Sequence, residues 1–398
     1  MDFPNLRISQ VVYVTSHKIT TTTSHALHSL FKKTIEPLIG YFLKICIFRE
    51  AALQGRLSRW VILPITTKIG NLWLHCRGFP SQFTTFQQER LARSRDFLAE
   101  FGTTEQILTK DGVSLRFTYY SAQQFNSWIE NQGGIREPDF IRVKDEASRK
   151  NLEKLEMFKF KKTQDGFQIP KISAGSNKIC ILRCNGFGLP IETDKKLIGL
   201  HLAAGFNYAI FEWRKAPSIQ GFFQDAETAY EAALKKGFEP SQIKALGYCG
   251  TTYVVANLKK NHHHEGLDAV LVGAHTSFRD VVAHTQWPVN QIGLLGLGAI
   301  ESPEANFDNI EKFKTLEQSQ AATCLIMDPN NEIAPPETIK RLTRSLEKTE
   351  NCKVILKSEN CSGQQFNFNK QFEIPEIWKQ YTSFLTRPIS STQPLHRV

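Results

Sequence analysis

The sequence has no pair of cysteines spaced as Cys-x-x-Cys, although it contains eight cysteines in 398 residues. The absence of that spacing removes the common signature of a structural zinc site. Cys180, Cys184, Cys324 and Cys352 lie inside or beside apolar runs, where cysteine behaves as a small buried hydrophobe. The sequence therefore predicts free thiols in a reducing compartment, with no bound metal and no cofactor.

Long hydrophobic runs are also missing. The opening MDFPNLRISQ lacks the basic start and the apolar stretch of a secretory signal. The apolar runs Pro37–Leu43 and Trp60–Thr67 each contain a proline and stop at a lysine, whereas a spanning helix needs about 20 apolar residues. We expect a cytoplasmic protein or one attached to a membrane surface, without a transmembrane helix.

Acidic residues are scarce in one region. Residues 1–80 contain ten Lys or Arg against three Asp or Glu, so +7 of the formal net charge of +10 lies there. Apolar residues between Leu27 and Ile45 recur at spacings of mostly three and four, which indicates amphipathic helix. We predict that residues 1–100 form a basic helical N-terminal module.

Two roles are open for this module. It could lie on an anionic membrane surface or bind a protein partner through residues 1–80, or its helices could pack against the domain that follows. Nucleic acid is not an expected partner, because the basic residues alternate with apolar ones and lack an aromatic platform.

Residues 101–390 have the pattern of a different domain. Two strands flank an Asp111-Gly112 turn, a strong hairpin signal. Continuous apolar runs, typical of strands buried on both faces, then alternate with helical segments. The runs are 178–184, 206–213, 242–248, 267–273, 323–327 and 352–357. This alternation predicts an α/β fold with a doubly wound, mostly parallel sheet.

Three details of this domain can be tested against a structure. The segment 142–162 is predicted to be a charged surface insertion, and 274–320 a lid-like or irregular insertion. A helix is predicted to begin at Asp225 and to stop at Gly237.

The stretch Gly247-Tyr248-Cys249-Gly250-Thr251 lies between a predicted strand and a predicted helix. This is the setting of a nucleophile elbow, with Cys249 at the position of the usual serine and Thr251 at that of a usual glycine. The helix N-terminus is expected to lower the pKa of the Cys249 thiol, and the Gly250 amide to face a developing oxyanion. The alternative is an ordinary strand-to-helix turn with a buried cysteine.

A second glycine-containing loop, Asn185-Gly186-Phe187-Gly188, ends the first strand predicted to be parallel. A loop at this position can supply the second oxyanion donor, for which the Phe187 amide is the expected group. Otherwise the glycines only redirect the chain.

Taken in order, these segments resemble the α/β-hydrolase superfamily, and more narrowly the chlamydial CHLPS family of uncharacterised proteins. The resemblance covers roughly residues 100–385 and rests on the motifs ILRCNGFG, GFNYAIFEWR, IKALGYCGTT, LDAVLVG and CLIMDPNNEIAPPE. It implies a nucleophile–histidine–acid triad on a hydrolase fold.

The sequence departs from that triad at two positions. The usual acid of an Asp-x-x-x-Pro pattern is replaced by Asn331, and Asp328 stands three residues too early. The loop 357–366, where the superfamily places its histidine, has none, and no histidine occurs between His284 and His396. Two histidines are considered as a substitute base: His275, just past the strand that follows the elbow, and His284 in the variable region after it. The alternative is that each is a polar loop residue. The run 262–264 of three histidines is expected to be a solvated helix end and not a metal site.

The sequence therefore predicts a hydrolase fold with a degenerate triad. The protein would be non-catalytic or weakly active and would bind a small acyl ligand. The Cys249 thiol would be acylated, and the acyl group would not be released from it. One alternative is an active cysteine-nucleophile ester or thioester hydrolase with a relocated base. The other is a membrane-surface or partner-binding protein that acts through its N-terminal module.

Overall fold

The computed structural model describes twelve segments: residues 91–136, 140–153, 161–163, 166–170, 178–186, 189–215, 218–280, 308–314, 321–327, 336–347, 352–356 and 372–387, apart from single positions within them. The predicted N-terminal module lies outside the described residues except for its last ten positions. Most of the predicted insertion at 274–320 lies outside them as well.

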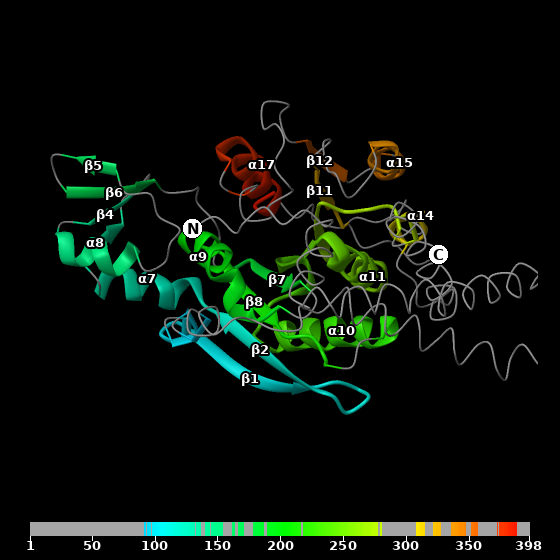
Figure 1. The fold of residues 1–398 in the computed structure, drawn as a ribbon, viewed down its shortest axis with the longest axis horizontal. Coiled ribbons are helices and arrows are strands. Elements are labelled where there is room, and N and C mark those ends of the chain that lie inside the picture. The colour runs from blue at the N-terminus through cyan, green and yellow to red at the C-terminus, as the bar shows by residue number, and fades with distance from the viewer. Residues whose placement is uncertain are drawn as a thin grey trace, which may run out of the picture.

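The centre of the fold is an eight-stranded sheet in the order β1-β2-β8-β7-β9-β10-β11-β12 (Figure 1). Only the pairs β1–β2 and β2–β8 are antiparallel within it. The predicted mostly parallel α/β sheet is therefore confirmed. The strands are β1 (Gly102–Leu108), β2 (Ser114–Tyr120), β7 (Cys180–Cys184), β8 (Asn207–Phe211), β9 (Ile243–Tyr248), β10 (Asp268–Val272), β11 (Thr323–Met327) and β12 (Cys352–Leu356).

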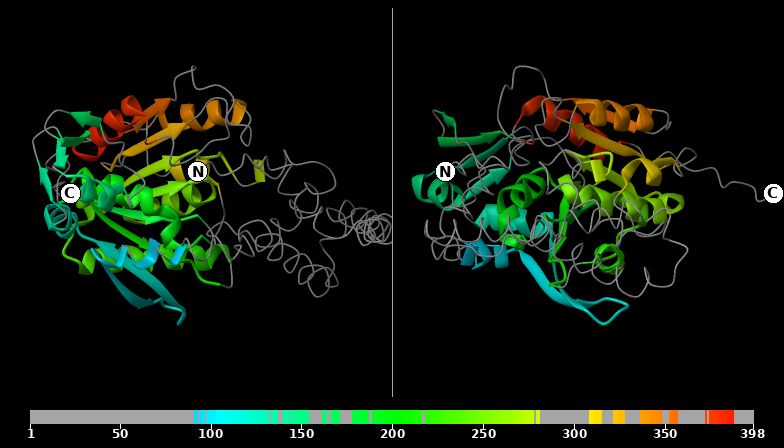
Figure 2. Two further views of the ribbon diagram at one scale, coloured as in Figure 1. Left: turned by 60° about the vertical axis from the view of Figure 1, so that its left-hand side comes forward. Right: turned by 45° about the vertical axis from the view of Figure 1, so that its right-hand side comes forward.

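Helices cover both faces of this sheet (Figure 2). On one face, α7 (Ala122–Asn131), α9 (Lys195–Ala203) and α17 (Pro375–Leu385) share a core with Ile181, Leu246 and Val270. On the other face a second core includes Leu182 and Leu271. Its helices are α10 (Ile219–Lys235), α11 (Thr252–His262), α14 (Asn309–Lys314) and α15 (Pro336–Glu347). Successive strand residues enter opposite cores, which explains why the strands are continuous apolar runs.

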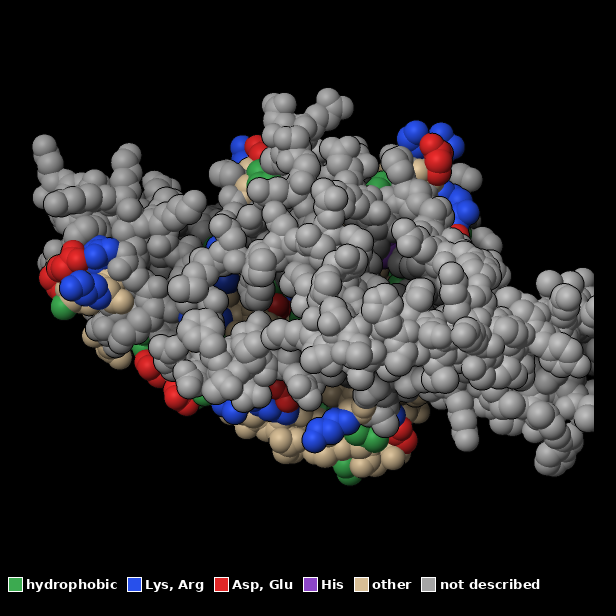
Figure 3. Space-filling model, in the orientation of Figure 1, with side chains coloured by type: hydrophobic (Ala, Val, Ile, Leu, Met, Phe, Trp, Pro, Cys, Tyr) green, Lys and Arg blue, Asp and Glu red, His purple; other side chains and the backbone are tan. Residues whose placement is uncertain are grey.

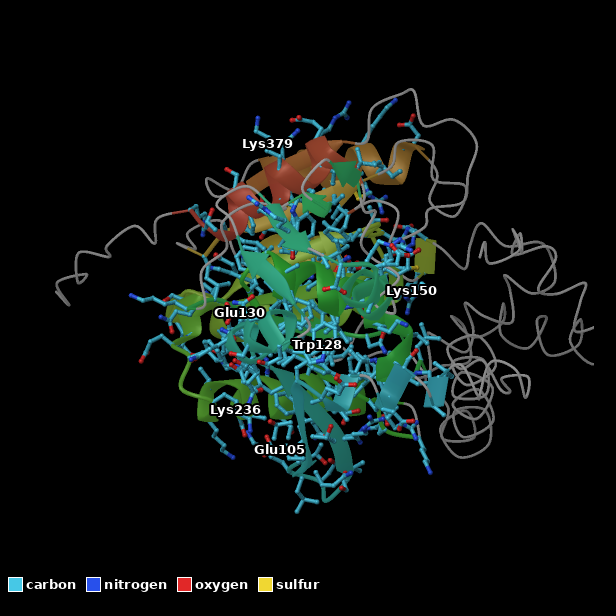
Figure 4. All side chains as sticks on the ribbon, turned by 90° about the vertical axis from the view of Figure 1, so that its left-hand side faces the viewer. Glu105, Trp128, Glu130, Lys150, Lys236 and Lys379 are labelled. Carbon is cyan, nitrogen blue, oxygen red and sulfur yellow. The ribbon has the colours of Figure 1, made fainter. Side chains whose placement is uncertain are left out.

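The β1–β2 hairpin turns at Asp111-Gly112 as predicted, with Gly112 at φ +82°. A glycine suits this position because it has no Cβ to clash. On β1, Glu105 forms an ion pair of 3.1 Å with Lys236 at the end of α10, and Figure 4 labels both residues in its lower part. Figure 3 shows positive and negative side chains interspersed along the hairpin.

The prediction that a helix begins at Asp225 is wrong. Helix α10 begins at Ile219 and is capped by Ser218, whose Oγ accepts from the Gly221 amide at 3.0 Å. Asp225 lies inside the helix and is buried, and it accepts from the Arg214 Nε at 2.9 Å. The carboxylate pairs with a buried guanidinium and does not serve as a helix cap.

The segment 142–162 is not simply a charged insertion. It contains helix α8 (Glu146–Glu153) and contributes to a second, antiparallel sheet in the order β3-β4-β6-β5. These strands are β3 (Gly134–Arg136), β4 (Phe140–Val143), β5 (Lys161–Thr163) and β6 (Gly166–Pro170). They have only three to five residues each, which is too short for a clear periodicity.

None of the helices within the described segments has both the length and the apolar character needed to cross a membrane.

Candidate active site

The turn after β9 has an unusual backbone at Cys249. Its φ is +52°, and no other non-glycine residue in the described segments has a positive φ. From Cys249 the chain passes through a single 3-10 turn, Cys249–Thr251, into α11. A left-handed conformation of this kind costs about 1–3 kcal/mol for a residue with a Cβ, and such strain clusters at active sites.

Two residues before Cys249, the turn requires a glycine. A Cβ on Gly247 would lie 2.9 Å from the carbonyl oxygen of Thr251 and 2.9 Å from Cγ2 of Val255. The first of these atoms belongs to the backbone and cannot rotate away. Gly247 therefore allows the strand to approach the start of α11 closely enough for the tight turn.

Thr251, which stands where a glycine is usual, has a defined structural role. Its buried hydroxyl accepts from the Tyr248 amide at 2.9 Å and lies 3.0 Å from the carbonyl oxygens of Cys184 and Tyr248. The Cys184 carbonyl is the last of β7, directly before the loop at Asn185. The threonine thus connects the turn at Cys249 to the beginning of that loop.

The loop after β7 is organised around the buried side chain of Asn185. Its Nδ2 donates to the Leu189 carbonyl at 2.9 Å, and its Oδ1 accepts from the Gly186 amide at 2.8 Å. The Trp213 indole donates to the Asn185 carbonyl at 2.7 Å. The Gly186 amide is therefore already engaged within the loop. Phe187, the expected oxyanion donor, lies outside the described residues.

The chain after β10 brings His275 to Cys249. Gly273 turns the chain at φ +60°, and Nε2 of His275 lies 3.6 Å from Sγ of Cys249. The register explains this proximity, because Tyr248 and Val272 are partners in the parallel pair β9–β10. Cys249 is one residue beyond that pair and His275 three residues beyond it, at the carboxyl edge of the sheet.

Burial controls the charges of both groups. His275 is 3% exposed, and burial lowers its pKa to about 4. Burial also raises the pKa of the half-buried Cys249 thiol, against the lowering effect of a hydrogen bond from the Gly250 amide. The prediction of a lowered thiol pKa is therefore wrong, because desolvation outweighs the donor at the start of the helix. At neutral pH the pair is a neutral thiol beside a neutral imidazole.

The second nitrogen of the imidazole, Nδ1, is buried and has no hydrogen-bond partner within the described segments. The two expected acids, Asp328 and Asn331, lie outside the described residues, as does the loop 357–366. The residue that does contact His275 from a distant part of the chain is Asn309, whose Nδ2 donates to the His275 carbonyl at 2.7 Å. Sequence reasoning missed Asn309, which lies within the predicted insertion at 274–320 and belongs to no motif.

The histidines at 262–264 are remote from this site. They lie at the far end of α11, where Nε2 of His262 contacts a carboxylate oxygen of Glu227 at 2.6 Å. Within the described segments no group of three or more His, Cys, Asp or Glu side chains is arranged to hold a metal ion.

Comparisons with known proteins place the fold. An α/β-hydrolase from Vibrio vulnificus has a similar structure, with a TM-score of 0.54 and 15% identity over 81% of this chain and 94% of that one. The Pyrococcus furiosus esterase Pf2001 matches with a TM-score of 0.45 and 10% identity, over 74% of this chain and 95% of that one. No family model and no curated protein matches the sequence. The likeness identifies the fold alone, and none of these structures concerns the chlamydial family.

Proposed function

On this α/β-hydrolase fold, we propose that the chain is an acyl hydrolase in which Cys249 is the nucleophile and His275 the general base. The observation that carries the proposal is the distance of 3.6 Å between Sγ of Cys249 and Nε2 of His275. A strained elbow cysteine and a buried imidazole meet at the sheet edge where ligand sites of open α/β folds lie.

The chemistry follows from the neutral state of the pair. Nε2 takes the proton of the thiol as sulfur attacks the carbonyl carbon, and the oxyanion receives the Gly250 amide, with Phe187 as the proposed second donor. The tetrahedral adduct collapses to a thioester on Cys249. An alkoxide leaving group takes the proton held by His275 as it departs, whereas a thiolate departs as an anion and His275 returns its proton to water. Water then attacks the thioester, again with His275 as base, and releases the carboxylic acid.

Thioesters are the substrate class that fits this pair best. A thiol leaving group has a pKa of about 8.5 and departs as an anion, whereas an alkoxide needs a proton at the moment of bond breaking. Burial lowers the pKa of His275 to about 4, which disfavours the imidazolium that must persist until an alkoxide leaves. We therefore expect higher kcat/KM for a thioester than for the matched oxygen ester.

A second candidate, acyl binding without turnover, is favoured by a different observation. Nδ1 of His275 has no partner within the described segments, so nothing there stabilises the imidazolium that each half-reaction creates. In that case a thioester could still acylate Cys249, because its thiolate leaves without a proton, but the acyl group would remain there, because its hydrolysis needs a base to activate water. This is the degenerate hydrolase predicted from the sequence.

One kinetic experiment separates the two candidates. The full chain is mixed with a short acyl thioester, and the released thiol is followed from the first turnover. The hydrolase is supported by sustained thiol release that is lost in Cys249→Ala and falls by roughly 10²–10⁴-fold in His275→Ala. That range is the typical contribution of general acid–base catalysis. Release of one equivalent of thiol, followed by no further release, supports acyl binding. If neither sustained release nor a burst is seen, both candidates are contradicted.

The matched control is His201→Gln. His201 is also a buried histidine, and burial lowers its pKa to about 3. Its Nε2 forms a hydrogen bond with the Tyr381 hydroxyl in the core that α7, α9 and α17 share. Its replacement is expected to lower stability without changing the kinetics. An equal kinetic loss in His201→Gln would show that the effect of His275→Ala is structural.

A further inference from the structure

The two residues of the proposed pair are connected by a buried amide from a third element. Asn309, the first residue of α14, is fully buried. Its Nδ2 donates to the His275 carbonyl at 2.7 Å and lies 3.4 Å from Oγ1 of Thr252. The Thr252 hydroxyl in turn donates to the Cys249 carbonyl at 2.5 Å. One amide group therefore reaches the backbone of both the nucleophile and the base.

The backbone around Asn309 is attached to the same loop. The Asn309 amide donates to the Thr276 carbonyl at 2.8 Å, and Asp308 forms an isolated antiparallel bridge with Ser277. The side chain and the backbone of Asn309 thus hold residues 275 and 276 from one side, while Thr252 holds the elbow from the other. The side chains of Asn309, Thr252 and His275 are all buried, where hydrogen bonds are shielded from water.

The direction of the Asn309 amide has a cost. Its Oδ1 is buried without a partner in the described segments, as is Nδ1 of His275. Leaving a buried polar atom unpaired costs about 1–3 kcal/mol. The amide is oriented so that its nitrogen faces both the His275 carbonyl and the Thr252 hydroxyl, and its own oxygen is left unpaired as a result.

We propose that Asn309 is a positioning residue, which sets the separation of the Cys249 sulfur and the His275 imidazole through the His275 carbonyl and Thr252. This inference rests on the proposed function, since it gives a role to the geometry of that pair. Asn309 touches neither reacting atom. Its effect is to keep Sγ and Nε2 at a distance from which a proton can pass between them.

The experiment uses two readouts on the full chain. The first is the pH dependence of Cys249 alkylation by iodoacetamide, followed by mass spectrometry of the Cys249 peptide. The second is kcat and KM for a short acyl thioester. Asn309→Ala is expected to lower kcat by about 10–100-fold with KM within about twofold, because a misplacement of about 1 Å can cost that much. Its alkylation profile is expected to approach that of His275→Ala.

Three further variants make the test specific. Thr252→Val removes the hydroxyl and is expected to act in the same direction, whereas Thr252→Ser keeps the hydroxyl and is expected to stay near wild type. If Asn309→Ala does not fold, the comparison of Thr252→Val with Thr252→Ser still tests the inference. Asn207→Ala is the matched control: Asn207 is another buried asparagine whose amide oxygen accepts from the Ala122 backbone, at the opposite edge of the sheet.

The outcomes separate a positioning role from a structural one. If Asn309→Ala lowers only thermal stability, as Asn207→Ala is expected to do, the residue is structural and the inference is overturned. Asn309→Asp places oxygen against the His275 carbonyl and is expected to lower kcat; a raised kcat would contradict the inference and show instead that His275 lacks an acceptor. If His275→Ala itself changes neither readout, the proposed function fails, whatever Asn309 does.

Discussion

At the scale of single residues, Cys249 combines a strained backbone with a side chain that is only half-buried. We expect a residue held in this way to contribute little packing to the core, because its position is imposed by the turn around it. Strain of this kind is offset by the rest of the fold and persists only where the surroundings over-determine it.

This property predicts the stability of two variants. Cys249→Ala is expected to change the free energy of unfolding by less than about 1 kcal/mol, since it keeps the strain and removes little packing. Cys249→Gly is expected to be more stable than Cys249→Ala by up to about 1 kcal/mol, because glycine adopts a positive φ without a Cβ clash. Urea unfolding at constant m-value measures both. A loss of several kcal/mol in Cys249→Ala would identify Cys249 as a core residue.

At the scale of the elements, one hydroxyl links the end of β7 to the turn after β9, in addition to the pairing of the two strands. Thr251→Val removes the acceptor of the Tyr248 amide and the donor to the Cys184 carbonyl. We expect a loss of about 1–3 kcal/mol, the cost of leaving buried polar groups unpaired. Thermal unfolding of Thr251→Ser, which retains the hydroxyl, provides the comparison. Equal losses in the two variants would assign the effect to the methyl group and not to the hydrogen bonds.

The elements also show how far the sequence predicts the structure. Strands buried on both faces, such as β9 and β11, are predicted within a residue or two, because a short continuous apolar run between turn residues is typical of a strand covered by helices. The second sheet is not predicted, because β3 and β5 have three residues each and no apolar run. The start of α10 is misplaced because Asp225 and Ser218 are both good caps, and only tertiary pairing with Arg214 decides between them.

The site is predictable to a similar extent. Parallel strands end at one edge, so residues just past β9 and β10 are expected to be close, and the structure brings His275 to Cys249. The shift of the thiol pKa is predicted with the wrong sign, because desolvation depends on the side chains that cover Cys249 and not on its place before a helix. Asn309 cannot be predicted, since its two bonds join segments that no motif relates.

At the scale of the whole molecule, two buried histidines make stability depend on pH. Burial lowers the pKa of His275 to about 4 and that of His201 to about 3, from 6.5. Between pH 6.5 and 4 the unfolded chain therefore binds protons that the folded chain does not. The stability due to each neutral imidazole is fully present above pH 6.5 and falls by about 1.4 kcal/mol per pH unit as the pH drops.

The free energy of unfolding is measured by urea at pH 7, 5.5 and 4.5. His275→Gln and His201→Gln are each expected to reduce the slope of this free energy against pH. Because glutamine does not titrate, any slope that remains in the double variant belongs to other groups. An unchanged slope in both single variants would mean that these imidazoles are hydrated in the folded protein.

The N-terminal part of the sequence carries most of the net charge of the chain. We propose that residues 1–80, with their charge of +7, attach the chain to an anionic membrane surface. Co-sedimentation with vesicles containing phosphatidylserine is expected at low salt and to weaken steeply as the Debye length shrinks from about 10 Å at 0.1 M towards 3 Å at 1 M. The variant Lys32→Glu/Lys33→Glu is expected to bind less. Equal binding to neutral phosphatidylcholine vesicles would contradict an electrostatic attachment.

The proposed nucleophile and the proposed base come from a single β–α–β unit, β9–α11–β10, and are separated by only 26 residues. During synthesis on the ribosome, this unit can fold before β11 and β12 have been made, since closing so short a loop costs little entropy. The thiol and the imidazole then meet in a nascent chain that still lacks α14 and the later strands. Before those elements arrive both groups are more hydrated, so the imidazole is more basic and the thiol more acidic than in the finished protein. We therefore expect the newly made chain to be more open to alkylation and oxidation at Cys249 than the mature one.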